Sequence, residues 1–263
     1  MRTPDALAQI ERRLAAAGVD TPRVDAEWLV AAVLRVSRTD VQLHDEVDAG
    51  QLEPLVRRRE QREPLAYVLG EWGFRRLTLK TDRRALVPRP ESEIVVERAL
   101  VLIRDLDEAR VLDLGTGTGA IALAIKDEHP RARVTGVDTS ADAVALAQEN
   151  ADRLGLDVEL RVAGIEAARE GWQLVVANPP YVRPEEWESL QPEIREWEPR
   201  SALVGDGIHE VIAGSANTRF LVVEVGDGQA QSVAAALAEL GYGEITISRD
   251  LTGIDRVVEA ERR

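Results

Sequence analysis

Residues 111–120 read VLDLGTGTGA, an apolar run that ends in a glycine-rich turn. Gly115, Gly117 and Ala120 fit the G-x-G-x-x-A pattern, in which glycines let the backbone approach a ligand at the start of a helix. Asp138 lies 21 residues beyond Gly117, at the end of the next apolar run, where a carboxylate can accept hydrogen bonds from ribose hydroxyls. The stretch therefore predicts a strand, a binding loop and a helix. Taken alone, it fits an NAD site, a phosphate site or a structural tight turn.

The sequence on both sides of this loop alternates between short β-branched runs and helical patterns. The runs are ARVLDL (109–114), ARVTGVD (132–138), DVELRV (157–162), QLVVAN (173–178) and RFLVVEV (219–225). Such alternation predicts an α/β fold with a mostly parallel, Rossmann-like sheet and helices on both faces. Only residues 251–254 separate the last two runs, GEITISRD and DRVVEAE, and this loop is too short for a parallel crossover. The sheet should therefore end in an antiparallel hairpin.

The first seventy residues have helical periodicity, with a third helical stretch expected over about 51–69. Residues 72–87 then alternate as strands do, with a turn expected near Thr81-Asp82. We expect a small helical domain over residues 1–71, a β-hairpin linker over 72–90 and a large α/β domain over 91–263.

Composition excludes several classes of protein. There is no Cys, and the three His are scattered, so neither disulfides nor a metal site is expected. The N-terminal stretch MRTPDALAQIERRL has no apolar signal region, and no run approaches a membrane-spanning length. We therefore expect a cytoplasmic protein without membrane association. The net charge of −14 argues against a broad phosphate-binding surface, and so against a nucleic-acid substrate.

Residues 57–89 are an exception to this acidic balance. They contain ten Arg or Lys against four acidic residues, a local charge of +6. A solvated helix and hairpin explain such a segment. A docking patch for a large partner is the alternative.

The stretch DLGTGTG (113–119), with the acid Asp113 and the third glycine Gly119, resembles motif I of the S-adenosylmethionine-dependent methyltransferases. The predicted terminal hairpin also resembles that class of fold. The resemblance implies S-adenosyl-L-methionine as cofactor and S-adenosyl-L-homocysteine as product. The implied cofactor-binding residues are Gly115, Thr116, Gly117, Thr118, Gly119, Asp138 and Asn178.

The run VVANPPYV (175–182) ends a strand at Asn178, because two prolines cannot donate to a sheet ladder. Ligands in an open α/β sheet bind outside the carboxyl ends of the strands, so this loop should face the cofactor. The Asn178 side-chain oxygen and the Pro179 carbonyl can each accept one hydrogen of a planar NH2 group. Tyr181 offers an aromatic wall for stacking. A structural Asn-Pro-Pro turn is the alternative interpretation.

Stretches along nearly the whole chain resemble the release-factor glutamine methyltransferase family (PrmC/HemK). In chain order they are EPLAYVLGEWGF (63–74), LVPRPESE (86–93), LDLGTGTGAIALAI (112–125), ANPPYV (177–182), WEPRSALVGDG (197–207) and RDLTGIDRVVEAER (249–262). The resemblance implies N5-methylation of the glutamine in the Gly-Gly-Gln motif of class-1 peptide chain release factors. We expect a monomer whose helical domain recognises the substrate. It implies Asn178, Pro179, Pro180 and Tyr181 as catalytic and substrate-binding residues, with Arg89 also at the substrate.

The same resemblance suggests that five residues help to close the site, although salt bridges with a structural role explain them equally well: Arg89, Glu91, Glu93, Glu198 and Arg200. Two features depart from the family pattern. Gly164 occupies the position expected for an acid that reaches the adenine amino group, with Glu166 as a shifted substitute. The segment 208–219 is also short, which questions the packing on one face of the sheet.

Two other functions are compatible with these residues. An Asn-Pro-Pro-Tyr sequence also occurs in methyltransferases that act on nucleic-acid bases. A cofactor-binding protein without turnover would fit the two departures.

Overall fold

The computed structural model describes residues 1–262, which form two compact units. The first unit comprises Met1–Glu71 and Gln191–Trp197, and the second comprises Trp72–Leu190 and the chain from Glu198 onward. Each unit has its own buried apolar core, as expected for separate domains.

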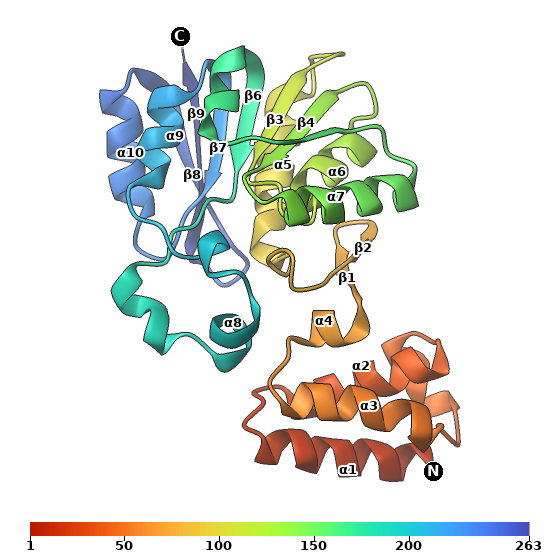
Figure 1. Ribbon diagram of the computed structural model, residues 1–263. Helices are drawn as coiled ribbons and strands as arrows, with labels where there is room; N and C mark the ends of the chain where they lie inside the picture. The colour runs from red at the N-terminus through yellow and green to blue at the C-terminus, as the bar shows by residue number, and fades with distance from the viewer. Residues whose placement is uncertain (263) are drawn as a thin grey trace. The chain divides into compact units, whose positions relative to one another are not determined.

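The first unit is built of helices (Figure 1). They are α1 (Thr3–Ala16), α2 (Pro22–Leu34), α3 (Ala49–Glu60), α4 (Leu65–Leu69) and α8 (Pro192–Trp197), with a 3-10 segment η1 (Arg38–Leu43). Leu7, Ile10 and Leu14 recur at helical spacing along α1 and are buried with Leu29 of α2 and Leu52 of α3.

The helical stretch predicted over about 51–69 consists of two helices, because α3 ends at Glu60 and α4 begins at Leu65. Arg62, between them, has a left-handed backbone with φ of +61°. Pro64 cannot donate an N–H to a helix that continues through it. The chain therefore turns between two separate helices.

A two-stranded hairpin of β1 (Glu71–Phe74) and β2 (Leu77–Lys80) follows α4. Its turn is Arg75-Arg76, so the turn predicted near Thr81-Asp82 is wrong. Arg75 takes the left-handed φ of +50° that this tight connection needs. The early turn buries Leu77 and Leu79 of β2, whereas Thr78 between them is exposed.

The second unit contains a seven-stranded sheet with the order β5-β4-β3-β6-β7-β9-β8. The strands are β3 (Arg110–Leu114), β4 (Arg133–Asp138), β5 (Glu159–Val162), β6 (Trp172–Ala177), β7 (Thr218–Glu224), β8 (Tyr242–Arg249) and β9 (Asp255–Arg262). Strands β3 to β7 pair in parallel, whereas β9 is antiparallel to both β7 and β8. The predicted mostly parallel sheet with an antiparallel terminal hairpin is confirmed.

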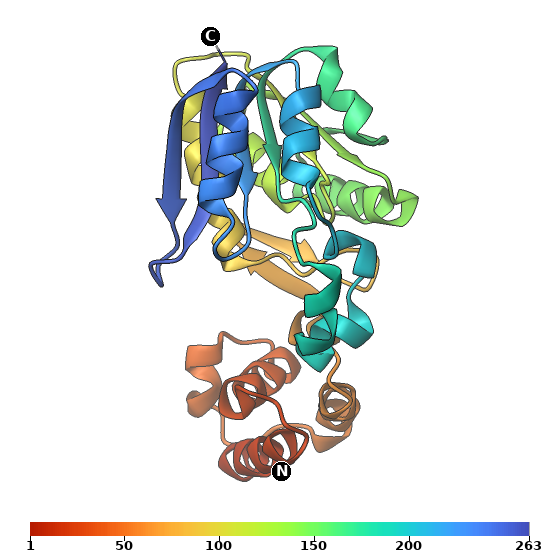
Figure 2. The ribbon, with the colours of Figure 1, turned by 90° about the vertical axis from the view of Figure 1, so that its left-hand side faces the viewer.

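Helices cover both faces of this sheet (Figures 1 and 2). They are α5 (Glu93–Ile103), α6 (Ala120–Glu128) and α7 (Ala141–Leu154) on one face, and α9 (Ile208–Ser215) and α10 (Ala230–Glu239) on the other. Side chains of β6 alternate between the two cores: Leu174 and Val176 enter one, and Val175 and Ala177 enter the other. The sheet is thus buried on both sides.

The short segment 208–219 does cover its face of the sheet. It forms α9, and both Ile212 and Ala213 are buried in the core on that side. Four further 3-10 segments connect elements of the second unit: η2 (Pro90–Ser92), η3 (Ile165–Glu170), η4 (Pro184–Ser189) and η5 (Arg200–Ala202).

Strand β3 lies between β4 and β6, and all three run in the same direction. Their carboxyl ends therefore lie side by side at one edge of the sheet. From β3 the successive strands β4 and β5 lie to one side, whereas β6 and β7 lie to the other. Open α/β sheets bind their ligands at such a point, where the strand order reverses. The glycine loop follows β3, and the loop that starts at Asn178 follows β6.

Candidate active site

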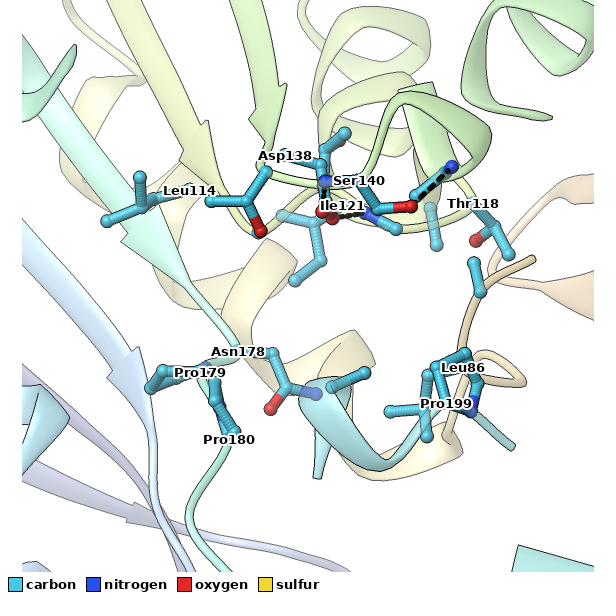
Figure 3. A pocket seen from close by; sticks show the side chains of 18 of the residues that line it. Leu86, Leu114, Thr118, Ile121, Asp138, Ser140, Asn178, Pro179, Pro180 and Pro199 are labelled. Atoms are coloured by element: carbon cyan, nitrogen blue, oxygen red, sulfur yellow. Dashed lines mark hydrogen bonds between the residues drawn. The ribbon is translucent and has the colours of Figure 1, made fainter. Parts of the chain in front are cut away.

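A cavity of about 360 Å³ opens at the carboxyl ends of β3, β4 and β6. Asp138 and Ser140 lie on one side of it, and Asn178, Pro179 and Pro180 lie on the opposite side (Figure 3). The predicted site residues that line this cavity are Arg89, Gly115, Thr116, Gly117, Thr118, Asp138, Asn178, Pro179 and Pro180. Gly119 and Tyr181 were also predicted for the site, but they do not line the cavity.

The glycines of the loop after β3 have different surroundings, although Gly115, Gly117 and Gly119 all have positive φ, of +80°, +54° and +83°. A Cβ added at Gly115 or Gly117 would meet no atom closer than 3.8 Å. A Cβ at Gly119 would lie 2.9 Å from the Leu123 side chain. The first two glycines therefore leave space for a ligand, whereas the third allows the loop to pack against α6.

Asp138 ends β4 with its carboxylate at the cavity. One oxygen accepts the Gly117 N–H at 3.1 Å, and the other accepts the Ser140 N–H at 2.9 Å. These bonds hold the side chain in place and leave further lone pairs for ligand hydroxyls. The arrangement fits the ribose-binding carboxylate that the spacing predicts.

Asp113 lies beneath the glycine loop and is only 1% exposed. Its Oδ2 accepts the Thr116 hydroxyl at 2.7 Å and the Ala122 N–H at 3.1 Å, while its Oδ1 has no partner. Burial raises the pKa of Asp113 to about 6, against the effect of those two hydrogen bonds. The side chain braces both ends of the loop.

The loop after β6 turns its first side chain into a polar network. The Asn178 Nδ2 donates to the Ser92 Oγ at 2.9 Å, and the Ser92 hydroxyl donates to Glu224 at 2.5 Å. Because the amide nitrogen is already used, the Asn178 side-chain oxygen is the group left for a ligand. The cavity therefore presents a hydrogen-bond acceptor at this position.

Tyr181 takes part in the same network from outside the cavity. Its hydroxyl donates to the second oxygen of Glu224 at 3.3 Å, and its backbone carbonyl accepts the Gln229 side-chain amide at 3.0 Å. Burial, followed by the Glu224 charge, raises the pKa of Tyr181 well above its usual range. The ring therefore anchors the loop and does not form the cavity wall that the sequence predicted.

Glu224 and Ser92 were not identified from the sequence as site residues. Glu224 ends β7 and is 1% exposed. Burial raises the pKa of Glu224 to about 7, although bonds from Ser92 and Tyr181 oppose this. An acid inside the apolar run LVVEV was the available signal, since a buried carboxylate without a cation is unusual.

The residues suggested for closing the site have mixed surroundings. Arg89 donates to Glu198 at 2.6 Å, and the buried Glu198 also accepts the Val87 N–H at 3.3 Å. This pair joins the segments before α5 and after α8 at the wall of the cavity. Arg200 instead stacks on the Trp187 ring, and Glu93 accepts the Arg75 N–H.

Gly164 lines the cavity, whereas its suggested substitute Glu166 does not. The Glu166 carboxylate folds back to accept the Gly164 N–H at 2.8 Å, and a Cβ on Gly164 would lie 2.8 Å from it. Backbone hydrogen bonds lower the pKa of this exposed carboxyl.

The basic segment 57–89 is largely neutralised by ion pairs within each unit. The pairs are Arg57–Glu53, Arg58–Glu63, Arg59–Asp25, Arg62–Glu193, Arg75–Glu128, Arg76–Asp127, Lys80–Glu149, Arg84–Asp82 and Arg89–Glu198. This pattern favours the interpretation as ion-paired structural elements over that of a docking patch. Among the described residues, no helix has the length and apolar character needed to cross a bilayer.

Comparison with known proteins identifies two family domains in the chain. Residues 5–70 match the family model of the PrmC N-terminal domain, and residues 96–195 match that of the methyltransferase small domain.

Solved structures share a similar fold over most of this chain. The hMettl16 catalytic domain in complex with the MAT2A 3′UTR hairpin 1 is similar with a TM-score of 0.57 at 15% identity, over 78% of this chain and 80% of that one. A methyltransferase from Pyrococcus furiosus is similar with a TM-score of 0.51 at 14% identity, over 70% of this chain and 88% of that one. At these identities the likeness concerns the fold alone, and it confirms a methyltransferase-type sheet.

Relatives of known name match over nearly the full length. The release factor glutamine methyltransferase of Geobacter sulfurreducens is 39% identical, covering 93% of this chain and 91% of its own. That of Deinococcus radiodurans is 38% identical, covering 100% of this chain and 99% of its own. That of Fusobacterium nucleatum is 34% identical, covering 93% of this chain and 75% of its own. The chain therefore belongs to the release factor glutamine methyltransferase family, as its sequence motifs indicated.

Proposed function

We propose that this protein transfers a methyl group from S-adenosyl-L-methionine to the side-chain amide nitrogen N5 of the glutamine in the Gly-Gly-Gln motif of class-1 peptide chain release factors. Membership of the family supports the reaction and the substrate. The observation that carries the proposal is the Asn178 amide, whose nitrogen is bonded to Ser92 and whose oxygen remains as an acceptor at the cavity.

The cavity fits the proposed cofactor on its own geometry. Gly115 and Gly117 leave open space where side chains would otherwise stand, and Asp138 can accept two ribose hydroxyls. Ala163, Gly164 and Ile165 line the cavity beyond β5 and offer a mostly apolar surface for a base. When bound, S-adenosyl-L-methionine supplies a methyl group on a positively charged sulfur, ready for displacement.

The loop after β6 positions the acceptor nitrogen. An amide nitrogen is a weak nucleophile because its lone pair is delocalised, so its NH2 group has to be held in one orientation. The Asn178 oxygen and the Pro179 carbonyl accept its two hydrogens, and Pro180 brings no competing N–H. The contribution of these residues is orientation, together with stabilisation of positive charge as it develops on the nitrogen.

No general base is required before transfer, since the nitrogen becomes acidic once it is methylated. The Arg89–Glu198 pair holds the wall of the cavity, and we assign the Arg89 guanidinium to substrate binding. We assign substrate recognition to residues 1–71, a linker to the hairpin region 72–90, and methyl transfer to residues 91–263. A translation factor as substrate places the reaction in the cytoplasm, and we propose that the enzyme acts as a monomer.

Intact-mass spectrometry of a class-1 release factor, incubated with the protein and S-adenosyl-L-methionine, tests the proposal. We expect one added methyl group on the Gly-Gly-Gln glutamine. The Asn178→Ala variant should reduce the rate about 10²-fold to 10³-fold, as for loss of one oriented polar group in an active site.

Asn217→Ala is the matched control. Asn217 is exposed and precedes β7, at the amino ends of the parallel strands and thus opposite to the cavity. The Asn217→Ala variant should methylate the release factor at the rate of the wild type. No methylation of the release factor, with methylation of DNA or RNA under the same conditions, would replace the proposed substrate by a nucleic-acid base.

A further inference from the structure

Three polar side chains form a chain of hydrogen bonds behind the acceptor loop. Glu224 accepts the Ser92 hydroxyl at 2.5 Å, and Ser92 accepts the Asn178 amide nitrogen at 2.9 Å. The three residues come from the end of β7, from η2 and from the loop after β6. Glu224 and Ser92 are buried, and neither Glu224 nor its bond to Ser92 has a part in the reaction described above.

The direction of these bonds depends on the charge of Glu224. An ionised carboxylate can only accept, so the Ser92 hydroxyl must donate to it and can offer only lone pairs to Asn178. The amide nitrogen then points to Ser92 and the amide oxygen to the cavity. A protonated Glu224 can donate to Ser92, whose own hydrogen is then free to bond the Asn178 oxygen.

In the second arrangement the Asn178 amide can turn over and present its NH2 group to the cavity. A donor in that position repels the NH2 group of a glutamine side chain instead of holding it. The two orientations of an amide have nearly the same shape, so packing cannot select between them and the hydrogen-bond network must do so.

We propose that Glu224 is a positioning residue that, acting through Ser92, keeps the Asn178 side-chain oxygen turned toward the acceptor nitrogen. This inference rests on the proposed function, since it explains how the loop after β6 keeps a hydrogen-bond acceptor directed at the glutamine nitrogen. Tyr181 supports the arrangement because its hydroxyl donates to the other oxygen of Glu224.

Charged and titratable groups surround Glu224 on each packed element. Glu91 in η2 raises the pKa of Glu224, whereas Arg256 in β9 lowers it and is itself bonded to Asp250 at 2.9 Å. His209 in α9 bonds the Glu224 backbone carbonyl at 2.8 Å, and burial lowers the pKa of that imidazole. With burial as the largest cause, the pKa of Glu224 rises to about 7, so both arrangements are accessible near neutral pH.

The test compares kcat for release factor methylation between pH 6 and pH 9 in the wild type, Glu224→Gln, Ser92→Ala and Ser92→Thr. We expect the wild-type kcat to fall as the pH drops through about 7, because protonation of Glu224 allows the Asn178 amide to turn its NH2 group toward the cavity. Glu224→Gln and Ser92→Ala should lose this dependence and, at pH 8.5, lower kcat about fivefold with little change in KM, as expected for one misdirected hydrogen bond. Ser92→Thr keeps the hydroxyl and should keep the wild-type profile.

Glu97→Gln is the matched control, since Glu97 is an exposed carboxylate on the neighbouring α5. It should leave the profile unchanged. A Glu224→Gln profile that superimposes on that of the wild type would overturn the inference.

A second measurement separates this inference from the proposed function. The side-chain NH2 signal of Asn178 in an amide NMR spectrum, assigned by its loss in Asn178→Ala, should titrate near pH 7 in the wild type and not in Glu224→Gln. If it titrates but the wild type does not methylate the release factor, the proposed function fails and the role of Glu224 stands. If it does not titrate while methylation proceeds, the role of Glu224 is overturned.

Discussion

Two sets of buried carboxylates in this protein, one in each unit, have different hydrogen-bond partners. In the helical unit, the buried Arg59 donates to Asp25 at 2.6 Å and to Glu193 at 2.8 Å, and Arg62 bonds the same Glu193 at 2.5 Å. In the second unit, called the catalytic unit from here on, the hydrogen-bond donors to Asp113 and Glu224 are hydroxyl and backbone N–H groups.

The pKa values follow these partners. Burial tends to raise the pKa of Glu193, but hydrogen bonds from Arg62 and Arg59 bring it below its ordinary value. Burial raises the pKa of Asp113 to about 6 and that of Glu224 to about 7. Glu193, with its two arginines, stays ionised and supports structure. Within the described part of the chain, Asp113 and Glu224 accept no hydrogen bond from a cation, and they titrate near neutral pH, as side chains at functional sites often do. A single arginine does not always suffice, because burial raises the pKa of Glu198 despite its bond from Arg89.

The largest effect on stability should come from breaking the paired cluster. Arg59→Met leaves Asp25 and part of Glu193 buried without their cation, and should destabilise the helical unit by about 3 to 5 kcal/mol. Hydrogen exchange of helical-unit peptides in increasing urea measures this loss. Arg57→Met is the matched control, because Arg57 lies on the same helix with its side chain 72% exposed. Equal losses in the two variants would remove the distinction between the units.

Asp113→Asn tests the pH dependence of stability in the catalytic unit, where the buried carboxyl should favour the folded state when it is protonated. The pKa of Asp113 is raised from 3.8 to about 6, so protonation of this group stabilises the folded wild type below pH 3.8. The free energy of unfolding should fall by roughly 3 kcal/mol as the pH rises through about 6. The asparagine variant lacks this loss, so its stability relative to the wild type should increase between pH 4 and pH 7. Urea unfolding followed by hydrogen exchange of β3 and α6 peptides measures the difference. A difference that is constant with pH would contradict the raised pKa.

The pH dependence of the helical unit should have the other sign. Because the pKa of Glu193 is lowered on folding, its contribution to stability is present above the ordinary value of 4.5 and is lost as the pH falls through the lowered value. In the wild type, helical-unit peptides should therefore lose protection from hydrogen exchange as the pH falls through the lowered pKa of Glu193. In Glu193→Gln, which has no carboxylate at this position, protection should not change for this reason over the same pH range. If acid protects them instead, the ion-paired cluster is not what stabilises this unit.

Two glycines of the binding loop sharpen the contrast between structure and ligand binding. Gly119→Ala should lower the stability of the catalytic unit by about 2 kcal/mol, because φ is +83° and the new Cβ would lie 2.9 Å from Leu123. Gly115→Ala meets open space and should cost less stability, while weakening binding of S-adenosyl-L-methionine. Thermal unfolding and calorimetric titration of the two variants measure these effects. A larger loss of stability at Gly115 than at Gly119 would reverse the assignment.

The smallest effect is expected at the partly exposed ion pairs of the helical unit. Arg13 bonds Glu53 and Glu60, and its side chain is 24% exposed. Arg13→Gln should cost about 0.5 to 1 kcal/mol, an effect that 1 M salt reduces further. Urea unfolding at low and high salt measures it. A loss as large as that of Arg59→Met would show that burial does not set the strength of these pairs.

Much of the catalytic unit could be predicted from the sequence because its signals are local. Alternating β-branched and helical segments gave the sheet, and the short loop 251–254 gave the antiparallel hairpin. The glycine spacing located Asp138 correctly at the cavity. The hairpin turn was misplaced because strand-like alternation continues past Arg75, and only the burial of Leu77 and Leu79 selects the earlier turn.

Local sequence alone sets where the chain bends and where its strands end, because glycine allows positive φ at 115, 117 and 119 and the two prolines after Asn178 have no N–H to donate. Which groups meet behind those loops depends on the packing of segments that are distant in the chain. Ser92 lies 86 residues from Asn178 and 132 residues from Glu224 along the chain. A hydrogen-bond partner at such separations depends on how strands and helices pack, and the pKa of a buried carboxyl depends on whether that packing also brings a cation.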